Sequence, residues 1–493
     1  MHVYIWAGLC KTPRSLYIRF MVSKMHFLIV AAFISLSGTV FAPPVLLAQI
    51  PQSHAQIKLS FAPLVKSAAP AVVNIYAKRL VRRKSRGSLF DDPFFNRFFG
   101  GSPFGGFTRE RLEKSLGSGV IVRSDGLIVT NHHVIQKAQE ITVVLSDRRE
   151  FAAKLVVSDK KTDIAVLRID PKEEALPYLV LADSDTIDVG DLVLAIGNPF
   201  GVGQTVTSGI VSALARTSVG VSDYRFFIQT DAAINPGNSG GALLGMNGRL
   251  LGVNTAIYSK RGGGSLGIGF AVPSNMVRTI IESAVTGKPL VRPWLSFTGS
   301  AVNTDVAGSL GLRRPVGVLV ERLHNKGPGK RAGIRPGDVV VSVGDHDVDN
   351  LEALRFRIAT KAIGDTVPLT LIRKGQTITL DFALVPPVED PPRNLFLLEG
   401  RNPFAGLSVG NLSPAVALSL DFDDMASGVI VLEVAPRSTA AQLGFKKRDI
   451  ILKVNEGDIV RVEDLKKAVT QRFTRWRIVL RRGGQDIGFE VTE

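Results

Sequence analysis

INPGNSGGALLG, at residues 234–245, places four glycines around a single serine, Ser239, between two apolar runs. A serine in so tight a turn is either an ordinary loop residue or a hydroxyl held out for chemistry. Serine becomes an effective nucleophile only when a base lies within hydrogen-bond reach and a third group orients that base. The rest of the chain must therefore supply a histidine and a carboxylate if Ser239 is to act.

Two histidines, His132 and His133, lie in the β-rich middle of the chain, at the end of the apolar run GLIVT. The other five fall near the N-terminus or in a repeated C-terminal region: His2, His26, His54, His324 and His346. A histidine at a strand end is often an ordinary surface residue, but a base held there beside a cleft suits proton transfer. Either member of the pair is therefore a candidate base.

The candidate acid is Asp163, which opens the apolar run DIAVLRI. An aspartate carried toward the interior by such a run needs a partner, and an imidazole N–H would serve. A strand-start or turn aspartate is the other interpretation of the same pattern.

The order of these residues along the chain decides between two folds. GNSGG, at 237–241, also fits the nucleophile elbow of the α/β-hydrolases, but that fold places its acid and its histidine after the serine. Here the only later histidines lie in the C-terminal repeats. The order His133, Asp163, Ser239 is instead that of the chymotrypsin-like barrels.

That order gives the glycine-rich turn a purpose. The backbone N–H groups of Gly237, Asn238 and Ser239 are expected to form an oxyanion hole, and the missing side chain of Gly237 lets the turn bend. Gly240 and Gly241 are expected to let the substrate backbone approach closely. The loop is therefore predicted to be catalytic.

The surrounding sequence predicts mostly β structure. From Ser118 onward, short β-type runs are separated by turn signals at intervals of roughly 8–15 residues, which indicates an all-β barrel or a pair of barrels. The segment 274–287 predicts a closing helix, with Ser274 as its N-cap and Gly287 as its stop. Upstream, the phenylalanine- and glycine-rich stretch 89–107 predicts a long loop.

An internal repeat fills the C-terminal part of the chain. Residues 317–358 align with residues 428–469, and the proline-rich stretch 384–392 links the two copies. Each copy runs from a strand through a small-residue turn and a short helix to a second strand, a second helix and a charged strand. The pattern predicts two copies of one α+β module.

Composition excludes several classes of protein. The chain has 493 residues, enough for about three domains. Its one cysteine, Cys10, excludes a disulfide framework, a zinc–cysteine site and a cysteine nucleophile, and no metal or other cofactor is expected. The net charge of +16 could favour polyanions or an envelope surface, but no nucleic-acid motif accompanies it, so nucleic acid is not an expected partner.

The N-terminus predicts export. From Met21, a lysine precedes an apolar run over about 27–41 that ends in small residues, the order of a secretory signal. Met21 or Met25 could be the true start, the cleavage site is open, and an uncleaved inner-membrane anchor is the alternative.

Three motifs together carry a family resemblance. TNHHV (130–134), TDIAVL (162–167) and QTDAAINPGNSGG (229–241), followed by two repeats, resemble the HtrA/Deg serine proteases, most closely the periplasmic DegP/DegQ type. The resemblance covers roughly 57–493 and implies that His133, not His132, is the base. It implies a mostly β multidomain chain with these parts: a signal peptide at 1–48, a chymotrypsin-like double β-barrel protease domain at 57–287 with a regulatory loop at 85–112, and two α+β PDZ domains at 290–388 and 393–493.

The resemblance also implies binding residues. Ile234, Leu266 and Ile268 would form a specificity pocket for small aliphatic side chains, and Arg216 would be an activation sensor. PDZ modules bind peptide C-termini by adding a strand, and the residues implied for this role are Leu295, Ser296, Phe297, Ala405, Gly406 and Leu407. Ser296 stands where the family carries glycine; if that position needs a positive φ, serine strains the loop and puts carboxylate capture by the first module in doubt.

The function expected from these features is that of an ATP-independent, exported serine endoprotease of the periplasm. It would degrade unfolded or damaged envelope proteins, act as a chaperone, and assemble as a trimer or a multiple of trimers, with the aromatic stretch around Phe94, Phe95, Phe98 and Phe99 offering contact surface. A catalytically silent PDZ scaffold or holdase is the alternative, and the intact set of His133, Asp163 and Ser239 argues against it. A polyanion-binding envelope protein is a third hypothesis, based on charge alone.

Overall fold

The computed structural model describes residues 60–81, 111–172, 174–198, 203–216, 226–235, 237–257, 267–471 and 473–492. The chain divides into Met1–Ser60 and Phe61–Glu493, and all the described helices and strands belong to the second unit. The predicted export signal and the stretch 89–107 lie outside the described residues. In the part that the structure describes, no helix is both long enough and apolar enough to cross a membrane.

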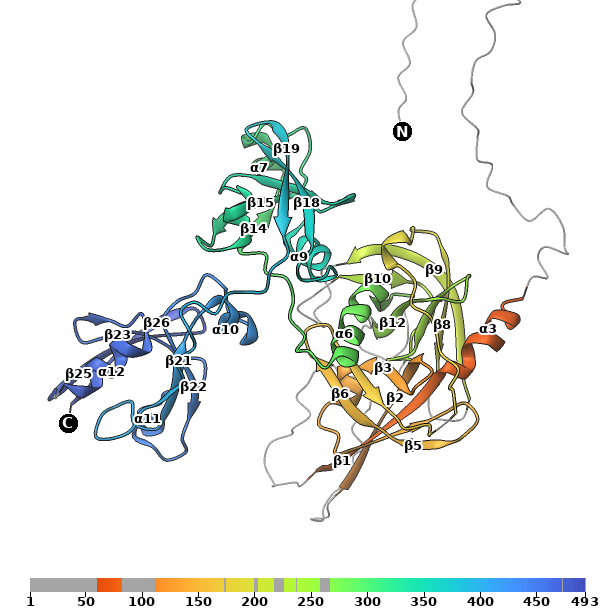
Figure 1. The fold of residues 1–493 in the computed structure, drawn as a ribbon, viewed down its shortest axis with the longest axis horizontal. Helices are drawn as coiled ribbons and strands as arrows, with labels where there is room; N and C mark the ends of the chain where they lie inside the picture. The colour runs from red at the N-terminus through yellow and green to blue at the C-terminus, as the bar shows by residue number, and fades with distance from the viewer. Residues whose placement is uncertain are drawn as a thin grey trace, which may run out of the picture. The chain divides into compact units, whose positions relative to one another are not determined.

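Seven antiparallel strands form the first sheet, in the order β5-β4-β1-β2-β3-β7-β6 (Figure 1). Their bounds are β1 Val72–Val81, β2 Arg111–Arg123, β3 Leu127–Asn131, β4 Glu140–Val144, β5 Glu150–Ala152, β6 Lys154–Asp159 and β7 Ile164–Arg168. The helix α3 (Ala62–Ala68) and the 3₁₀ turn η1 (Ala69–Ala71) precede β1. Because Asn131 pairs with Ile164, the end of β3 lies beside the start of β7.

A closed six-stranded barrel follows, in the order β10-β13-β12-β11-β8-β9. Its strands are β8 Leu192–Gly197, β9 Thr205–Arg216, β10 Phe227–Thr230, β11 Ala242–Gly245, β12 Leu250–Ile257 and β13 Gly269–Pro273. All residues of β11 and β13 are buried, as expected of short apolar runs that line a closed barrel. The predicted pair of barrels is thus present as one closed barrel and one open, seven-stranded sheet.

The helix α6 (Ser274–Thr286) closes this part of the chain, as predicted, and packs against β7 and β12. Gly287 ends it with a φ of 67°, which confirms the stop. The predicted N-cap was wrong: Pro273 occupies that position, and the Ser274 hydroxyl instead donates to the carbonyl of Ala182 at 2.9 Å.

The two C-terminal repeats form two sheets in which five strands follow the same order and a short strand pairs with the third of them, which confirms the repeat; the second sheet has one further edge strand, β20. The first copy contains β14 Phe297–Ala301, α7 Thr304–Ser309, β15 Val318–Leu323, α8 Pro328–Ala332, β16 Val339–Val343, β17 His346–Asp347, α9 Leu351–Ala359, β18 Thr366–Arg373 and β19 Gln376–Ala383. The second contains β20 Phe396–Leu397, β21 Leu407–Asn411, α10 Pro414–Ser419, β22 Val429–Val434, α11 Thr439–Gln442, β23 Ile450–Val454, β24 Gly457–Asp458, α12 Val462–Thr470, β25 Arg475–Arg482 and β26 Gln485–Thr492.

A buried ion pair repeats with the fold. Asp338 pairs with Arg373 in the first copy, and Asp449 pairs with Arg482 in the second, each with an N–O distance of 2.7 Å. Both aspartates are almost fully buried, so each charge needs its arginine partner. The sequence repeat is therefore also a repeat of specific contacts.

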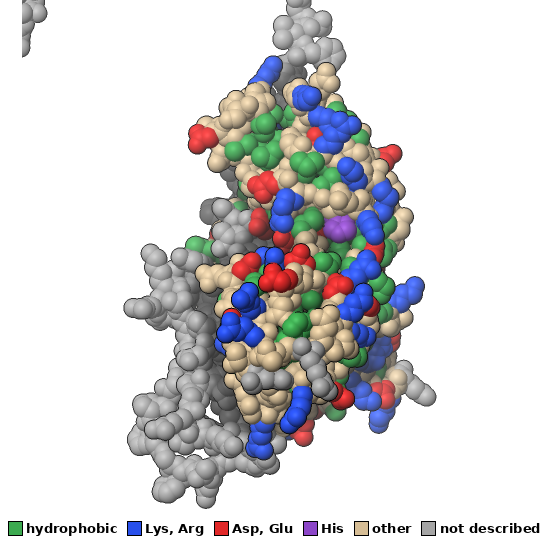
Figure 2. All heavy atoms as spheres, turned by 90° about the vertical axis from the view of Figure 1, so that its left-hand side faces the viewer, with side chains coloured by type: hydrophobic (Ala, Val, Ile, Leu, Met, Phe, Trp, Pro, Cys, Tyr) green, Lys and Arg blue, Asp and Glu red, His purple; other side chains and the backbone are tan. Residues whose placement is uncertain are grey.

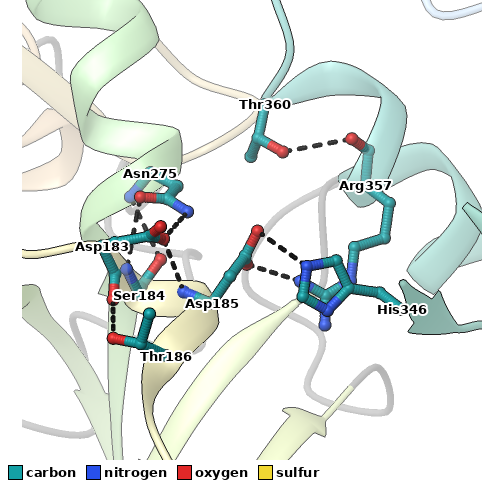
Figure 3. A network of polar contacts seen from close by, with 8 residues as sticks. All are labelled: Asp183, Ser184, Asp185, Thr186, Asn275, His346, Arg357 and Thr360. Atoms are coloured by element: carbon teal, nitrogen blue, oxygen red, sulfur yellow. Dashed lines mark hydrogen bonds and ion pairs between the residues drawn. The ribbon is translucent and has the colours of Figure 1, made fainter. Parts of the chain in front are cut away.

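An ion-pair network involves the 3₁₀ turn η2 (Ser184–Thr186) and the helix α9 (Figure 3). Asp185 accepts from Arg357 of α9 at 2.5 Å and lies 3.5 Å from Nε2 of His346. Asp183 caps the turn by accepting from the Asp185 N–H, and Asn275 of α6 donates to Asp183 at 2.7 Å. The turn is therefore tied to α6 through Asp183, while Asp185 pairs with α9.

The surface carries charges of both signs. On the face drawn in Figure 2, lysine and arginine side chains are interspersed with acidic and apolar side chains. Elsewhere in the described chain, independent of this view, Arg322 pairs with Asp423 at 2.8 Å. On this face the positive net charge is therefore spread out and partly compensated locally.

Candidate active site

His133 and Asp163 meet where β3 ends and β7 begins. The short helix α5 (His132–Ile135) starts directly after β3, and Asp163 is the last residue before β7. The backbone N–H of His133 donates to Oδ1 of Asp163 at 2.9 Å, and Nδ1 of His133 lies 2.7 Å from Oδ2. Two contacts between the same residues fix the plane and the tautomer of the imidazole, because Nδ1 must carry the proton that faces the carboxylate.

Asp163 has an unusual backbone conformation, with a φ of 58°. The left-handed region costs a residue with a side chain about 1–3 kcal/mol. Two hydrogen bonds to its carbonyl hold it there: the N–H of His132 and Nδ2 of Asn131 both donate at 3.0 Å. The strain therefore sits at the residue that orients the imidazole.

The Asp163 carboxylate is buried and ionised. Burial raises the pKa of this carboxyl, but the attraction of the adjacent His133 ring in its protonated form and the hydrogen bonds from His133 and Thr255 outweigh that effect, so the pKa lies below its usual value. The ionised form is the one that accepts from an imidazole N–H and stabilises an imidazolium.

Thr255 is a site residue that the sequence did not indicate. It lies on β12 and is fully buried. Its Oγ1 donates to Oδ2 of Asp163 at 2.6 Å, and its carbonyl accepts from Oγ of Ser239 at 3.2 Å. Thr255 thus connects the buried Asp163 to Ser239. Nothing in the sequence indicates this role, because a threonine within a strand-like run is common.

His132 lies differently from its neighbour. Its Nδ1 is 2.6 Å from Oγ of Ser158. Burial lowers its pKa, against the opposing effect of the Asp163 charge. Of the two adjacent histidines, His133 is thus the one whose ring contacts the Asp163 carboxylate.

Ser239 lies in a turn whose peptide groups have defined partners. We call residues 237–241 the nucleophile loop. Gly237 and Gly240 have φ values of 103° and 84°, which favour glycine. The N–H of Asn238 donates to the carbonyl of Asn235 at 3.0 Å. Because that N–H is occupied, the expectation that Asn238 donates to an oxyanion needs correction; Gly237 and Ser239 remain the candidate donors.

The predicted role of Gly240 and Gly241 was also wrong. A Cβ on Gly240 would lie 2.1 Å from the carbonyl oxygen of Ser118, and one on Gly241 would lie 2.2 Å from that of Ile196. The close neighbours are the protein's own strands. These glycines therefore let the nucleophile loop pack against the barrel wall.

The predicted pocket and sensor residues are only partly described. Ile234 is buried, and its side chain packs closely against Gly269. A Cβ added to Gly269 would lie 2.8 Å from Cδ1 of Ile234. Ile268 is half-buried nearby in sequence, whereas Leu266 lies outside the described residues. Arg216 ends β9, where its backbone pairs with Phe227.

The two predicted peptide-binding loops differ by an exchange of serine and glycine. Ser296 has a φ of 61°, and Gly406, its counterpart, has a φ of 92°. A Cβ on Gly327 would lie 2.2 Å from Cβ of Ser296, just as a Cβ on Gly406 would lie 2.2 Å from Cβ of Ser438. In each loop, one of the two contacting positions must therefore be glycine. The first loop has its serine at 296, opposite Gly327, whereas the second has its serine at 438, opposite Gly406.

The hydroxyl performs a similar task in both loops. Oγ of Ser296 accepts from the N–H of Gly329, in the first turn of α8, at 2.9 Å, and Oγ of Ser438 accepts from Ala441, in the first turn of α11, at 3.1 Å. The other predicted residues form the surrounding core. Leu295, Phe297 and Leu407 are buried, and Ala405 is half-buried.

Comparison with known proteins gives consistent matches. A trypsin-like peptidase domain model matches residues 117–253, and a PDZ domain model matches residues 264–384. The periplasmic pH-dependent serine endoprotease DegQ of Escherichia coli (strain K12) is 38% identical over 439 residues, 87% of this chain and 90% of DegQ. The periplasmic serine endoprotease DegP of Salmonella typhimurium (strain LT2) is 36% identical over 455 residues, 88% of this chain and 92% of DegP. Among solved structures, the HtrA-type protease AlgWS227A with decapeptide aligns with a TM-score of 0.50 and 42% identity, covering 68% of this chain and 99% of that one.

Proposed function

Because this chain belongs to the HtrA family and is a serine endopeptidase, we propose that it cuts peptide bonds with Ser239 as nucleophile, His133 as general base and Asp163 as the group that orients the base. The observation that carries the proposal is the connected set of contacts from His133 through Asp163 and Thr255 to Ser239. Histidine, aspartate and serine are the residue types that this form of acyl transfer needs, and the contacts between them support the proposal.

In the proposed reaction, His133 accepts the proton of the Ser239 hydroxyl as Oγ attacks the scissile carbonyl. Asp163 keeps the Nδ1 proton in place and stabilises the positive charge that forms on the ring. The same proton then passes to the leaving amine, and a water molecule, activated by His133, releases the acyl group. The lowered pKa of Asp163 supports this role, because the carboxylate stays ionised throughout.

The negative charge on the former carbonyl oxygen needs donors in place before it forms. We assign this role to the backbone N–H groups of Gly237 and Ser239. Preorganised donors of this kind are worth about 10²–10³ in rate each. We also propose that Ile234 belongs to the wall of a pocket that takes small aliphatic side chains.

The substrates of a serine endopeptidase with a PDZ domain are peptides and proteins. The proposed substrates are unfolded or damaged proteins of the periplasm, the compartment named for the DegQ and DegP relatives. We further propose ATP-independent action, a chaperone activity and assembly into trimers or multiples of trimers. Cleavage of casein without nucleotide, and light scattering of the full-length protein, test the first and the last of these.

The decisive comparison for the catalytic proposal is casein degradation by the wild type and by Ser239→Ala. The variant should retain its fold and lose cleavage. If both forms instead protect a denatured client from aggregation and neither cleaves casein, the silent scaffold or holdase is the better description.

A further inference from the structure

We propose that Ser118 is a positioning residue for catalysis: its hydroxyl and its backbone N–H hold the peptide planes of the nucleophile loop so that the N–H of Ser239 faces the developing oxyanion. The inference rests on the proposed role of Ser239. Ser118 lies on β2, far from the loop in sequence, and is fully buried.

Ser118 contacts the nucleophile loop on both sides of Ser239. Its Oγ donates to the carbonyl of Gly237 at 2.6 Å, and its backbone N–H donates to the carbonyl of Ser239 at 2.8 Å. The same Oγ accepts from the N–H of Asn198 at 2.8 Å, which leaves its proton free to point at Gly237. The hydroxyl is therefore used as donor and acceptor at once.

These contacts fix directions because a peptide group is planar. Anchoring the Gly237 carbonyl sends the Asn238 N–H the opposite way, where it meets Asn235. The carbonyl of Asn238 accepts from the Gly241 N–H at 2.9 Å, so the Ser239 N–H must point away from Gly241. Of the three successive peptide planes that define the turn, Ser118 anchors the first and the last.

The strand itself is held against the loop. Oγ1 of Thr130 donates to the carbonyl of Ser118 at 2.7 Å. The absent side chain of Gly240 is what permits the approach, since a Cβ there would lie 2.1 Å from that same carbonyl oxygen and 2.4 Å from Oγ1 of Thr130. Backbone and side chains of β2 and β3 thus form a fixed support directly behind the nucleophile loop.

The surroundings of Ser118 are polar and already contain groups without hydrogen-bond partners, so the loss of its hydroxyl would add to them. Asn74 pairs with Ser118 across the strands, which places both side chains on one face. Among the described residues, the side-chain amides of Asn74 and Asn238 and the Oδ1 of Asn198 have no hydrogen-bond partner, and all three residues are buried. Removing the Ser118 hydroxyl would add the Gly237 carbonyl and the Asn198 N–H to these unpaired groups, and the loop could relieve that only by rotating a peptide plane.

The test compares Ser118→Ala, which removes the hydroxyl, and Ser118→Cys, which keeps the shape but donates weakly. Ser274→Ala is the matched control, because it removes another fully buried serine hydroxyl that donates to a backbone carbonyl of the same domain. Kinetics on a short chromogenic peptide give kcat and KM separately, and a peptide boronate, which forms a tetrahedral adduct with the serine, reports on the oxyanion site.

A positioning role predicts that Ser118→Ala lowers kcat by about 10- to 100-fold with KM within threefold, since donors are misaimed and not removed. Boronate affinity should fall by a similar factor, and Ser118→Cys should lie between the alanine variant and the wild type. Ser274→Ala should lower the melting temperature comparably and leave kcat unchanged.

Two outcomes separate the possible failures. If Ser239→Ala abolishes activity but Ser118→Ala, normalised to titrated active sites, keeps the wild-type kcat and boronate affinity, the role of Ser118 is refuted and the nucleophile stands. If Ser239→Ala remains active, the proposed function itself fails.

Discussion

The serine–glycine exchange between the two C-terminal modules leads to a quantitative prediction. Ser296→Gly relieves a left-handed conformation, worth about 1 kcal/mol, but loses the hydrogen bond to Gly329, also worth about 1 kcal/mol. The two effects nearly cancel. Gly327→Ser alone places a Cβ 2.2 Å from Cβ of Ser296 and should cost about 2–3 kcal/mol.

The double variant Ser296→Gly, Gly327→Ser should recover most of that loss. It removes the opposing Cβ and places a hydroxyl at position 327, the N-cap of α8, where the second module carries Ser438. The coupling energy between the two sites should therefore be about 2–3 kcal/mol in favour of the double variant.

Hydrogen exchange of the full-length chain, followed at the amides of β16, reports the local stability of the first module. Gly327→Ser should speed exchange there by about 30- to 150-fold, and the double variant should return it to within a few-fold of the wild type. Gly406→Ser is the mirror control, because its Cβ would meet Ser438 at the same 2.2 Å, and its effect should appear at β23 instead. Additive effects of the two first-module substitutions would refute the reasoning.

Three further predictions concern the protease domain. Thr255→Val removes the donor to Asp163 but keeps the carbonyl that meets Ser239; kcat should fall about 10- to 100-fold, and equal kcat in steady-state assays would remove Thr255 from the account. Because the pKa of Asp163 is lowered in the folded protein, its ionised form stabilises the native state above the pKa of an aspartate in the unfolded chain, near 4, and this stabilisation is lost as pH falls through the lower folded value. In Asp163→Asn, denaturation curves should therefore show a smaller loss of unfolding free energy below about pH 4 than in the wild type. An unchanged dependence of the unfolding free energy on pH would contradict the lowered pKa. Arg357→Ala and Asp185→Asn should each speed hydrogen exchange in α9 by about tenfold, with no further increase in the double variant, because the two side chains form one largely buried pair; additive increases would mean that they act separately.

Much of the candidate site could be predicted from sequence because its chemistry is tied to a few residue types in a fixed order. Ser239, Asp163 and the adjacent pair His132 and His133 follow from one glycine-rich turn and the scarcity of histidine in the middle of the chain, whereas the choice of His133 within the pair came from the family resemblance. Ser118 and Thr255 could not be predicted, because their contacts depend on which strands pair and in what register. A buried serine or threonine in a strand gives no local sign of its partner.

The incorrect predictions have related causes. Ser274 looked like an N-cap because it precedes an amphipathic helix, but a carbonyl from a distant turn takes its hydroxyl. Gly240 and Gly241 looked like an opening for substrate, but neighbouring strands of the same domain fill that space. In each case a local rule named the right residue type, and a tertiary contact decided its use.

The central claim is that Ser239, activated by His133, forms the covalent intermediate. A serine-reactive phosphonate, followed by mass spectrometry of the labelled peptide, tests it most directly. The account predicts a single adduct on Ser239 in the wild type and in His132→Ala, and labelling slowed by at least about 10³-fold in His133→Ala. An adduct on another residue, or undiminished labelling of Ser239 in His133→Ala, would contradict it.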